Sequence, residues 1–186
     1  MEIDGIAFDA FGTLFDLGDL EQPFKQRVVP WTWHATASGR FRPLPEIVAG
    51  VGIDPQRVQS LPAYDDVAPG LDALRGRELA VLSNGTREGI ERLVENAGLG
   101  GRFAHLLAAD QVRRYKPAPE MYALAPKAFG TEAGRVLLVS GNEWDVAGAA
   151  QAGLRTAWLA RGREPAWVFG TEPDLVVQTI AELAEL

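Results

Sequence analysis

The chain has 186 residues, 47% of them hydrophobic and 23% charged, so it can form one well-packed core and does not resemble a disordered or fibrous sequence. Its formal net charge is −7 and it has no basic stripe. This argues against a nucleic-acid partner, because neutralising phosphates supplies most of that affinity. The absence of cysteine excludes disulfides, thiolate zinc sites and a cysteine nucleophile.

The first residues carry acidic side chains, Glu2 and Asp4, where a secretory signal peptide carries basic ones. No later stretch of the sequence approaches the roughly 20 apolar residues that a membrane-spanning helix needs. We therefore expect a cytoplasmic protein with no membrane partner.

Short apolar runs alternate with helical patterns along the chain, which predicts an α/β fold with a mostly parallel sheet. Apolar residues recur at helical spacing in 87–97, 119–130 and 146–152, and the tail 177–186 is amphipathic. The expected strands are residues 3–8, 79–82, a weaker 104–109, 136–139 and 156–160. Val176 and Val177 could end a short sixth strand or open the last helix. This order of strands and helices favours a Rossmann-like, doubly wound sheet.

Residues 16–64 break the alternation between the first two expected strands. They contain half of the chain's 12 prolines. We predict that they form a small, mainly helical cap inserted after the first strand, and that residues 1–15 and 65–186 form the core domain. Four aromatic residues of this segment either line a pocket or form the cap's own small core: Trp31, Trp33, His34 and Phe41.

Polar residues end three of the expected strands, namely Asp9, Ser83 and Ser140. Ligands of open parallel sheets bind outside the carboxyl ends of the strands. Asp9 is followed by a Gly-Thr turn in Phe8-Asp9-Ala10-Phe11-Gly12-Thr13-Leu14-Phe15-Asp16, and backbone N–H groups around it would keep its carboxylate ionised. The block therefore favours a nucleophile at Asp9 over a carboxylate that only caps a turn.

Two further blocks could place polar groups beside Asp9. The segment Leu82-Ser83-Asn84-Gly85-Thr86 is suited to hold an anionic oxygen, and it is equally typical of a helix N-cap. In Tyr115-Lys116-Pro117-Ala118-Pro119, two prolines restrict the backbone around a lysine that could keep a carboxylate ionised. The alternative is a surface lysine before a helix.

The last block is Ser140-Gly141-Asn142-Glu143-Trp144-Asp145. Asp145 would stand at a helix N-terminus, where a carboxylate is favoured whether it acts on a substrate or only caps the helix. Tyr122, on the helix expected after residue 119, could reach a substrate carboxylate or pack in the core.

In this order and spacing, the four blocks resemble the four motifs of the haloacid dehalogenase-like hydrolase superfamily. The resemblance covers residues 1–16 and about 65–162, and the insertion only in part. It implies a Rossmann-like core with a cap over the strand ends, and Asp9 as the covalent nucleophile.

Two positions depart from the phosphatases of this superfamily. Those enzymes have a second Asp two residues after the nucleophile, where this chain has Phe11. They also have an acidic metal ligand four residues before the last Asp, where it has Gly141. Carboxylates are the usual protein ligands of Mg²⁺, so the departures imply weak or no Mg²⁺ binding and poor phosphatase activity.

The same positions resemble the metal-independent (S)-2-haloacid dehalogenases, which have an aromatic residue after the nucleophile and Asn-x-Trp-Asp in the last motif. This resemblance implies no cofactor and a small anionic substrate, a short 2-haloalkanoate. Asp9 would displace halide from C2, water would hydrolyse the aspartyl ester, Lys116 would keep Asp9 ionised, and Asn142 and Asp145 would position or activate the water. The resemblance assigns orienting or substrate-binding roles to Ala10, Phe11, Thr13, Trp33, Ser83, Asn84, Tyr122 and Ser140.

The expected cap differs from that branch in two ways. The branch supplies an arginine for the halide several residues before a Tyr-Thr-Trp stretch; here the stretch is Trp31-Thr32-Trp33, the aligned residue is Lys25, and Arg27 lies close by. Lysine lacks the planar fork of arginine, so Lys25 or Arg27 could receive the leaving group. The cap is also short, which implies a more open pocket. Such a pocket could mean a larger substrate, a second subunit of a homodimer that closes the site, or reduced activity.

Two other functions stay open at this point. The first is a phosphatase-like hydrolase that acts on a small phosphomonoester through an unusual metal site, and Phe11 and Gly141 argue against it. The second is a non-catalytic member that binds a small anion or a protein partner. The presence of Asp9, Lys116 and Asp145 argues against that function.

Overall fold

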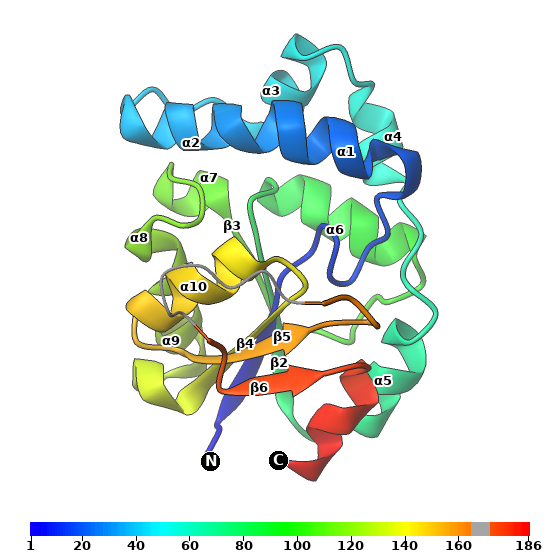
Figure 1. Cartoon of the computed structure of the whole chain (residues 1–186), viewed down its shortest axis with the longest axis vertical. Helices are drawn as coiled ribbons and strands as arrows, with labels where there is room; N and C mark the ends of the chain where they lie inside the picture. The colour runs from blue at the N-terminus through cyan, green and yellow to red at the C-terminus, as the bar shows by residue number, and fades with distance from the viewer. Residues whose placement is uncertain (165–171) are drawn as a thin grey trace.

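The computed structural model describes residues 1–164 and 172–186, and its centre is a parallel sheet (Figure 1). The six strands stand in the order β3-β2-β1-β4-β5-β6. They are β1 (Gly5–Phe8), β2 (Glu78–Ser83), β3 (His105–Ala108), β4 (Val136–Ser140), β5 (Arg155–Leu159) and β6 (Leu175–Val177). The chain runs outward from β1 to β3 on one side and from β4 to β6 on the other. The switch point of the sheet therefore lies between β1 and β4.

Each expected strand is present, and the doubly wound α/β fold is confirmed. Every residue of β1 and β4 is buried, as expected for central parallel strands covered by helices on both faces. The two valines near the end belong to the sixth strand, Leu175–Val177. The tail that follows is a 3-10 helix, Ile180–Glu185, whose first turn is capped by reciprocal Thr179 and Glu182 contacts.

Helices cover both faces of the sheet, as right-handed crossovers require. The helices α5 and α6 follow the outward path to β3, whereas α9 and α10 lie on the other side of the sheet (Figure 1). The helix expected over 119–130 is divided at Ala123, since Pro126 has no N–H to donate to the carbonyl of Tyr122. The core helices are α5 (Val67–Ala73), α6 (Arg87–Asn96), α7 (Ala109–Val112), α8 (Pro119–Tyr122), α9 (Leu124–Phe129), η3 (Ala133–Arg135) and α10 (Glu143–Gln151).

Residues 18–59 form helices that lie across the carboxyl-end side of the sheet, and we call this segment the cap (Figure 1). Where the chain leaves and re-enters the core, the Asp16 N–H donates to the Pro62 carbonyl and the Tyr64 N–H to the Leu14 carbonyl. These bonds close the insertion at its base; the domain limits at 16 and 64 stay a prediction. The cap contains η1 (Gly18–Leu20), α1 (Glu21–Pro23), the π-helical turn η2 (Phe24–Val28), α2 (Val29–Ala37), α3 (Leu44–Gly50) and α4 (Pro55–Gln59).

In the two described ranges, no helix combines the length and the apolar character needed to cross a membrane.

The packing of α9 on β1 can be tested at Gly5. A Cβ at this position would stand 2.5 Å from the Phe129 ring. We expect Gly5→Ala to lower the free energy of unfolding by roughly 1–3 kcal/mol, because the ring and its helix must shift. Urea denaturation measures the change, with Gly134→Ala as the control, since a Cβ there meets nothing within 4 Å. Equal stability of the two variants would contradict this packing.

Candidate active site

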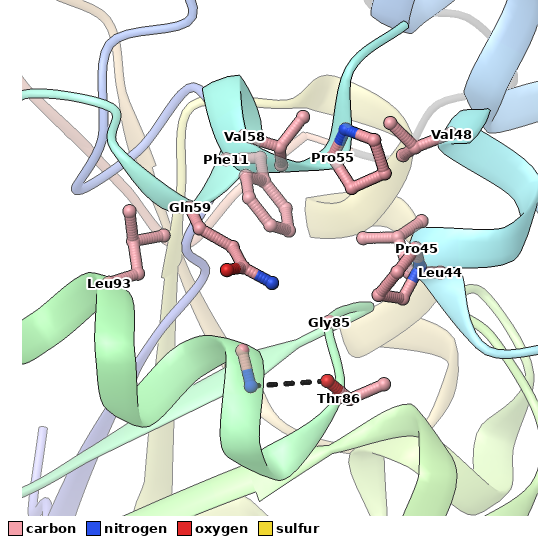
Figure 2. Close-up of a pocket in the computed structure, with 11 residues that line it drawn as sticks. Phe11, Leu44, Pro45, Val48, Pro55, Val58, Gln59, Gly85, Thr86 and Leu93 are labelled. Carbon is pink, nitrogen blue, oxygen red and sulfur yellow. Dashed lines mark hydrogen bonds between the residues drawn. The ribbon is translucent and has the colours of Figure 1, made fainter.

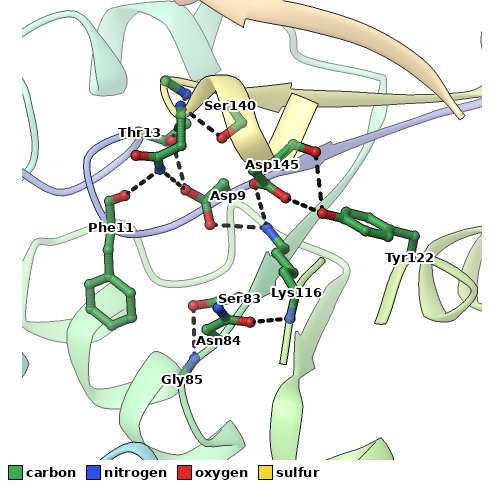
Figure 3. Close-up of polar contacts among 12 residues, drawn as sticks. Asp9, Phe11, Thr13, Ser83, Asn84, Gly85, Lys116, Tyr122, Ser140 and Asp145 are labelled. Carbon is green, nitrogen blue, oxygen red and sulfur yellow. Dashed lines mark hydrogen bonds and ion pairs between the residues drawn. The ribbon is translucent and has the colours of Figure 1, made fainter. Parts of the chain in front are cut away.

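Asp9 is the first residue after β1, at the switch point of the sheet. Its N–H donates to the Val139 carbonyl at 3.0 Å, which continues the pairing with β4. The next residues fold into a tight turn in which the Ala10 carbonyl accepts N–H groups from residues 13, 14 and 15 and Gly12 has a φ of +76°. This turn brings the Thr13 hydroxyl back to Asp9, where it donates to Oδ2 at 2.9 Å (Figure 3).

The loop after β4 supplies a second donor to the same oxygen. Asn142 Nδ2 lies 3.0 Å from Asp9 Oδ2 and 3.1 Å from the Phe11 carbonyl oxygen. Ser140 Oγ accepts the Asn142 N–H at 3.1 Å, and Thr13 Oγ1 accepts the Gly141 N–H at 2.9 Å. The loops after β1 and β4 are therefore joined around one carboxylate oxygen.

Lys116 holds the other oxygen of Asp9. Its ammonium nitrogen lies 3.0 Å from Asp9 Oδ1 and 2.8 Å from Asp145 Oδ2 (Figure 3). The Lys116 side chain is fully buried, and its backbone N–H donates to Asn84 Oδ1 at 2.8 Å. Ser83 Oγ accepts the Gly85 N–H at 3.1 Å and thereby shapes the turn that carries Asn84. One buried cation thus bridges the carboxylate that follows β1 and a carboxylate in the first turn of α10.

Asp145 is fixed from its far side by Tyr122. The Tyr122 hydroxyl donates to Asp145 Oδ1 at 2.8 Å, and both side chains are buried. Gly148, one turn further along α10, makes room for this contact, since a Cβ there would lie 2.5 Å from the hydroxyl oxygen. Tyr122 therefore reaches the site instead of only packing in the core.

Burial and charge act against each other at this site. Burial lowers the pKa of Lys116, but the carboxylates of Asp145 and Asp9 outweigh it and hold that pKa above its ordinary value. Burial also raises the pKa of Asp145, while the Lys116 ammonium and the Tyr122 hydroxyl oppose the rise. Burial, with the nearby Asp145 charge, raises the pKa of Tyr122 well above its usual range. Lys116 is therefore a fixed cation and Tyr122 a neutral hydrogen-bond donor.

Two predicted cap cations have other partners in the structure. Lys25 forms an exposed ion pair with Glu21 at 2.6 Å, and an Arg27 guanidinium nitrogen donates to the Val51 carbonyl. Neither is among the hydrogen-bond partners of the Asp9 carboxylate in the described chain. Both stand on the π-helical turn η2, beside Phe24, whose ring packs on the Phe11 ring at a centroid distance of 5.2 Å. The turn is thus near the Asp9 loop, although its cations are engaged elsewhere.

The four cap aromatics do not form a single group. Trp33 packs edge-to-face on Trp144, with ring centroids 5.8 Å apart, and this contact joins α2 to the first turn of α10. Trp31 and His34 line a groove on the cap between α2 and α3. Phe41 instead stacks on the ring of Tyr115 in the core.

An apolar pocket lies between the cap and the N-terminal end of α6, and the Phe11 ring is part of its wall (Figure 2). It holds about 340 Å³ of empty space, part of it open to solvent. Its other lining residues come from α3, α4, α6 and the turn after Asn84: Leu44, Pro45, Val48, Pro55, Val58, Gln59, Gly85, Thr86, Gly89 and Leu93.

Two residues that contribute to the site were not predicted as such. Gly148 lies within a run of small residues on α10, and that run is the only signal the sequence carries for its close approach to Tyr122. Tyr115 stands next to Lys116 and is fully buried, with its hydroxyl donating to the Arg42 carbonyl in the cap. Its place in the Tyr-Lys-Pro block was the available signal.

The residues around Asp9 do not fit a magnesium ion. A Cβ on Gly141 would overlap the carbonyl oxygen of Gly12, so an acidic side chain has no room at the position where the phosphatases carry one. Lys116 already occupies the space between the Asp9 and Asp145 carboxylates. Within the described ranges, no three acidic or histidine side chains are grouped so that they could hold a metal ion.

The doubly wound parallel sheet, with a buried and hydrogen-bonded carboxylate at its switch point, defines a Rossmann-like α/β protein with a candidate nucleophile at its strand ends. The chain belongs to the haloacid dehalogenase-like hydrolase family, whose family model matches residues 3–153. An (S)-2-haloacid dehalogenase of Pseudomonas sp. (strain YL) is 33% identical, over 99% of this chain and 94% of that enzyme. Haloacetate dehalogenase H-2 of Moraxella sp. (strain B) is 30% identical, over 100% and 98% of the two chains.

Solved structures give the same relationship. The L-2-haloacid dehalogenase from Xanthobacter autotrophicus superposes with a TM-score of 0.88 at 27% identity, over 99% of this chain and 98% of that chain. A structure of that enzyme with chloropropionic acid covalently bound superposes with a TM-score of 0.84 at 26% identity, with the same coverage. The alignment with the Moraxella enzyme spans 219 positions against 186 residues here, so that enzyme has segments which this chain lacks.

The Tyr122 contact predicts a shift in the ionisation of Asp145. The hydroxyl opposes the effect of burial, so Tyr122→Phe should raise the pKa of Asp145 further, and the carboxylate should lose its charge at a higher pH than in the wild type. A ¹³C NMR titration of the Asp145 carboxyl group measures this. Tyr64→Phe is the control, because Tyr64 lies under Arg161 and away from Asp145. An unchanged titration in Tyr122→Phe would contradict the contact.

Proposed function

We propose that the chain is a metal-independent 2-haloacid dehalogenase that requires no cofactor and displaces halide from a short 2-haloalkanoate through an aspartyl-ester intermediate. The observation that carries this proposal is the Asp9 carboxylate, held at both oxygens by donors, in a site with no room for a metal-binding side chain at position 141. The relatives named as haloacid dehalogenases, and the related structure with covalently bound chloropropionic acid, support the same reaction.

In the first step, an Asp9 oxygen attacks C2 of the substrate and the carbon–halogen bond breaks, with its electron pair leaving as halide. Thr13, Asn142 and Lys116 hold the carboxylate in one orientation, so little reorganisation is needed before attack. Ser83, Asn84 and the Ala10 backbone would hold the substrate carboxylate. Esterification removes the charge of Asp9, while Lys116 keeps its partner Asp145.

In the second step, water attacks the carbonyl carbon of the Asp9 ester and passes a proton to Asp145. The oxyanion forms on the Asp9 oxygen that is not esterified, so Lys116 would stabilise it if that oxygen is Oδ1, and Thr13 and Asn142 would do so if it is Oδ2. The bond between the Asp9 carbonyl carbon and the ester oxygen, which Asp9 supplied in the first step, then breaks. One of the two water protons goes to this oxygen as the 2-hydroxyalkanoate leaves, and the other is released to solvent. The products are halide, a 2-hydroxyalkanoate and one proton, and Asp9 keeps one oxygen from water.

The halide would be received by Lys25 or Arg27, in a site that otherwise holds two carboxylates and one ammonium. The Lys25–Glu21 pair joins exposed residues one helical turn apart, and such pairs contribute only about 0.3–0.5 kcal/mol, so halide could replace Glu21. The π-helical turn changes the helical register at these residues, and the Phe24–Phe11 contact brings the turn to the Asp9 loop.

The structure argues against the alternative phosphatase activity in the same site. Phe11 replaces the second Asp, its ring is packed on Phe24, and Gly141 cannot be extended toward a metal without moving the Gly12 turn. A non-catalytic anion-binding role leaves unexplained why three ionisable groups, Asp9, Lys116 and Asp145, are buried together at considerable desolvation cost.

We also propose a cytoplasmic location and a homodimer. The absence of cysteine suits a reducing compartment. Trp31, half-exposed at the rim of the cap groove, is the kind of side chain that subunit interfaces cover.

Halide release from a panel of 2-haloacids tests the reaction. We expect release that a chelator does not inhibit, and a roughly 10³-fold or greater loss in Asp9→Asn, because the amide is a poor nucleophile. Asp19→Asn, on an exposed aspartate paired with Arg57, is the matched control and should retain activity. Mg²⁺-dependent phosphate release from phosphomonoesters, without halide release, would favour the phosphatase.

The ester mechanism predicts where the oxygen from water goes. During turnover in ¹⁸O-water, the peptide that contains Asp9 should gain ¹⁸O, because water attacks the aspartyl carbonyl. After a single turnover with excess enzyme, the hydroxy acid should contain only ¹⁶O in its new hydroxyl group. Mass spectrometry of peptide and product measures both, and ¹⁸O found only in the hydroxy acid would show direct attack by water instead.

A further inference from the structure

The cap contacts the core one residue before the buried lysine of the site. Tyr115 is fully buried, its N–H donates to Thr36 Oγ1 at 2.9 Å, and its hydroxyl donates to the Arg42 carbonyl. The Phe41 ring stacks on the Tyr115 ring at a centroid distance of 5.2 Å and an interplanar angle of 25°. Backbone, ring and hydroxyl of this one tyrosine therefore all meet the cap.

The two residues before Tyr115 strengthen the same junction. Arg114 Nη1 donates to the Thr36 carbonyl at 2.7 Å. Arg113 adopts a left-handed backbone, with φ of +54°, and places its guanidinium 5.3 Å from the centre of the Phe41 ring. The end of α2 and the segment that follows it thus hold three consecutive residues of the core.

The next residue along the chain is Lys116, whose ammonium must stay within hydrogen-bond distance of two carboxylates. The Lys116 N–H is bound by Asn84 from the core, and the preceding N–H is bound by Thr36 from the cap. The backbone that carries the lysine is therefore fixed from both sides. A shift of about 1 Å at such a group is enough to reduce a reaction rate strongly.

We propose that Thr36 and Tyr115 are positioning residues, through which the cap sets the place of the Lys116 ammonium between Asp9 and Asp145. The kinetic part of this proposal rests on the proposed dehalogenase function, and the geometric part does not. In this way the cap fixes the position of the catalytic lysine. The stretch that connects α2 to α3, residues 38–43, is short and carries both Phe41 and the Arg42 carbonyl.

The Thr36 hydroxyl can be removed without changing the shape of the side chain. Thr36→Val keeps the volume and leaves the Tyr115 N–H without its acceptor, whereas Thr36→Ser keeps the acceptor. Thr32→Val is a matched control on the same helix, because the buried Thr32 hydroxyl donates only to the Val29 carbonyl of α2. Tyr115→Phe removes the bond to Arg42 and keeps the stacked ring.

Acylation of lysine amines measures the position of Lys116 without any turnover. In the wild type, burial should protect Lys116 from an amine-acylating reagent, while Lys25 and Lys127, the other lysines, react and serve as references. In Thr36→Val, acylation of Lys116, read by peptide mass spectrometry, should become roughly tenfold faster, as expected when one buried hydrogen bond is lost. Thr36→Ser and Thr32→Val should retain protection, and Tyr115→Phe should show a smaller increase.

Steady-state kinetics supply the second measurement. Thr36→Val should lower kcat by a similar factor with little change in KM, and Thr36→Ser should restore it. Equal acylation of Lys116 in Thr36→Val and Thr32→Val, with both folded, would overturn the proposal. If Thr36→Val does not fold, protection of Lys116 as complete in Tyr115→Phe as in the wild type would overturn it instead. If Lys116 is acylated faster in Thr36→Val as expected, but the wild-type protein releases no halide, the proposed function is contradicted and the positioning role of Thr36 and Tyr115 is not.

Discussion

The rest of the site depends on one buried interaction, the bridge from the Lys116 ammonium to the carboxylates of Asp9 and Asp145. Removing three charges from water is costly, and only close, well-partnered contacts offset that cost. Each oxygen of the two carboxylates accordingly has a donor, from Lys116, Thr13, Asn142 or Tyr122. The loops after β1 and β4 and the segment before α8 must therefore stay in register with one another.

The same bridge sets the charge of the site. Two carboxylates and one ammonium leave one negative charge in a space where water is largely excluded, and a free anionic substrate would be repelled. An anionic haloacid therefore needs hydrogen-bond donors and a further cation close to Asp9. Lys25 and Arg27 are the cap cations nearest in sequence to Phe24, the η2 residue whose ring contacts Phe11. Once Asp9 is esterified, Lys116 and Asp145 balance each other, which favours the charge distribution of the intermediate over that of the free enzyme.

The sequence predicts those parts of the site that arise from local structure. Polar residues at strand ends, such as Asp9 and Ser140, come together because parallel strands present their carboxyl ends at one edge of the sheet. The contacts of Tyr115 with Thr36 and Arg42 join segments more than 70 residues apart, and no local pattern encodes them. The division of the helix at Ala123 has a local cause, Pro126, which the sequence contains. The need for glycine at position 148 instead depends on the position of the Tyr122 hydroxyl, which is set by how α8 packs against α10.

A short cap was expected to leave the site more open, and the structure shows how few contacts suffice to cover it. Asp9 is only 6% exposed, and Lys116 and Asp145 are fully buried. Three aromatic contacts join the cap to the core near them, Phe24 on Phe11, Trp33 on Trp144 and Phe41 on Tyr115. Each of these core residues lies within two sequence positions of Asp9, Lys116 or Asp145. The cap therefore excludes water by contacting the segments that carry the catalytic residues. A small cap of this kind closes the site through the position of its contacts.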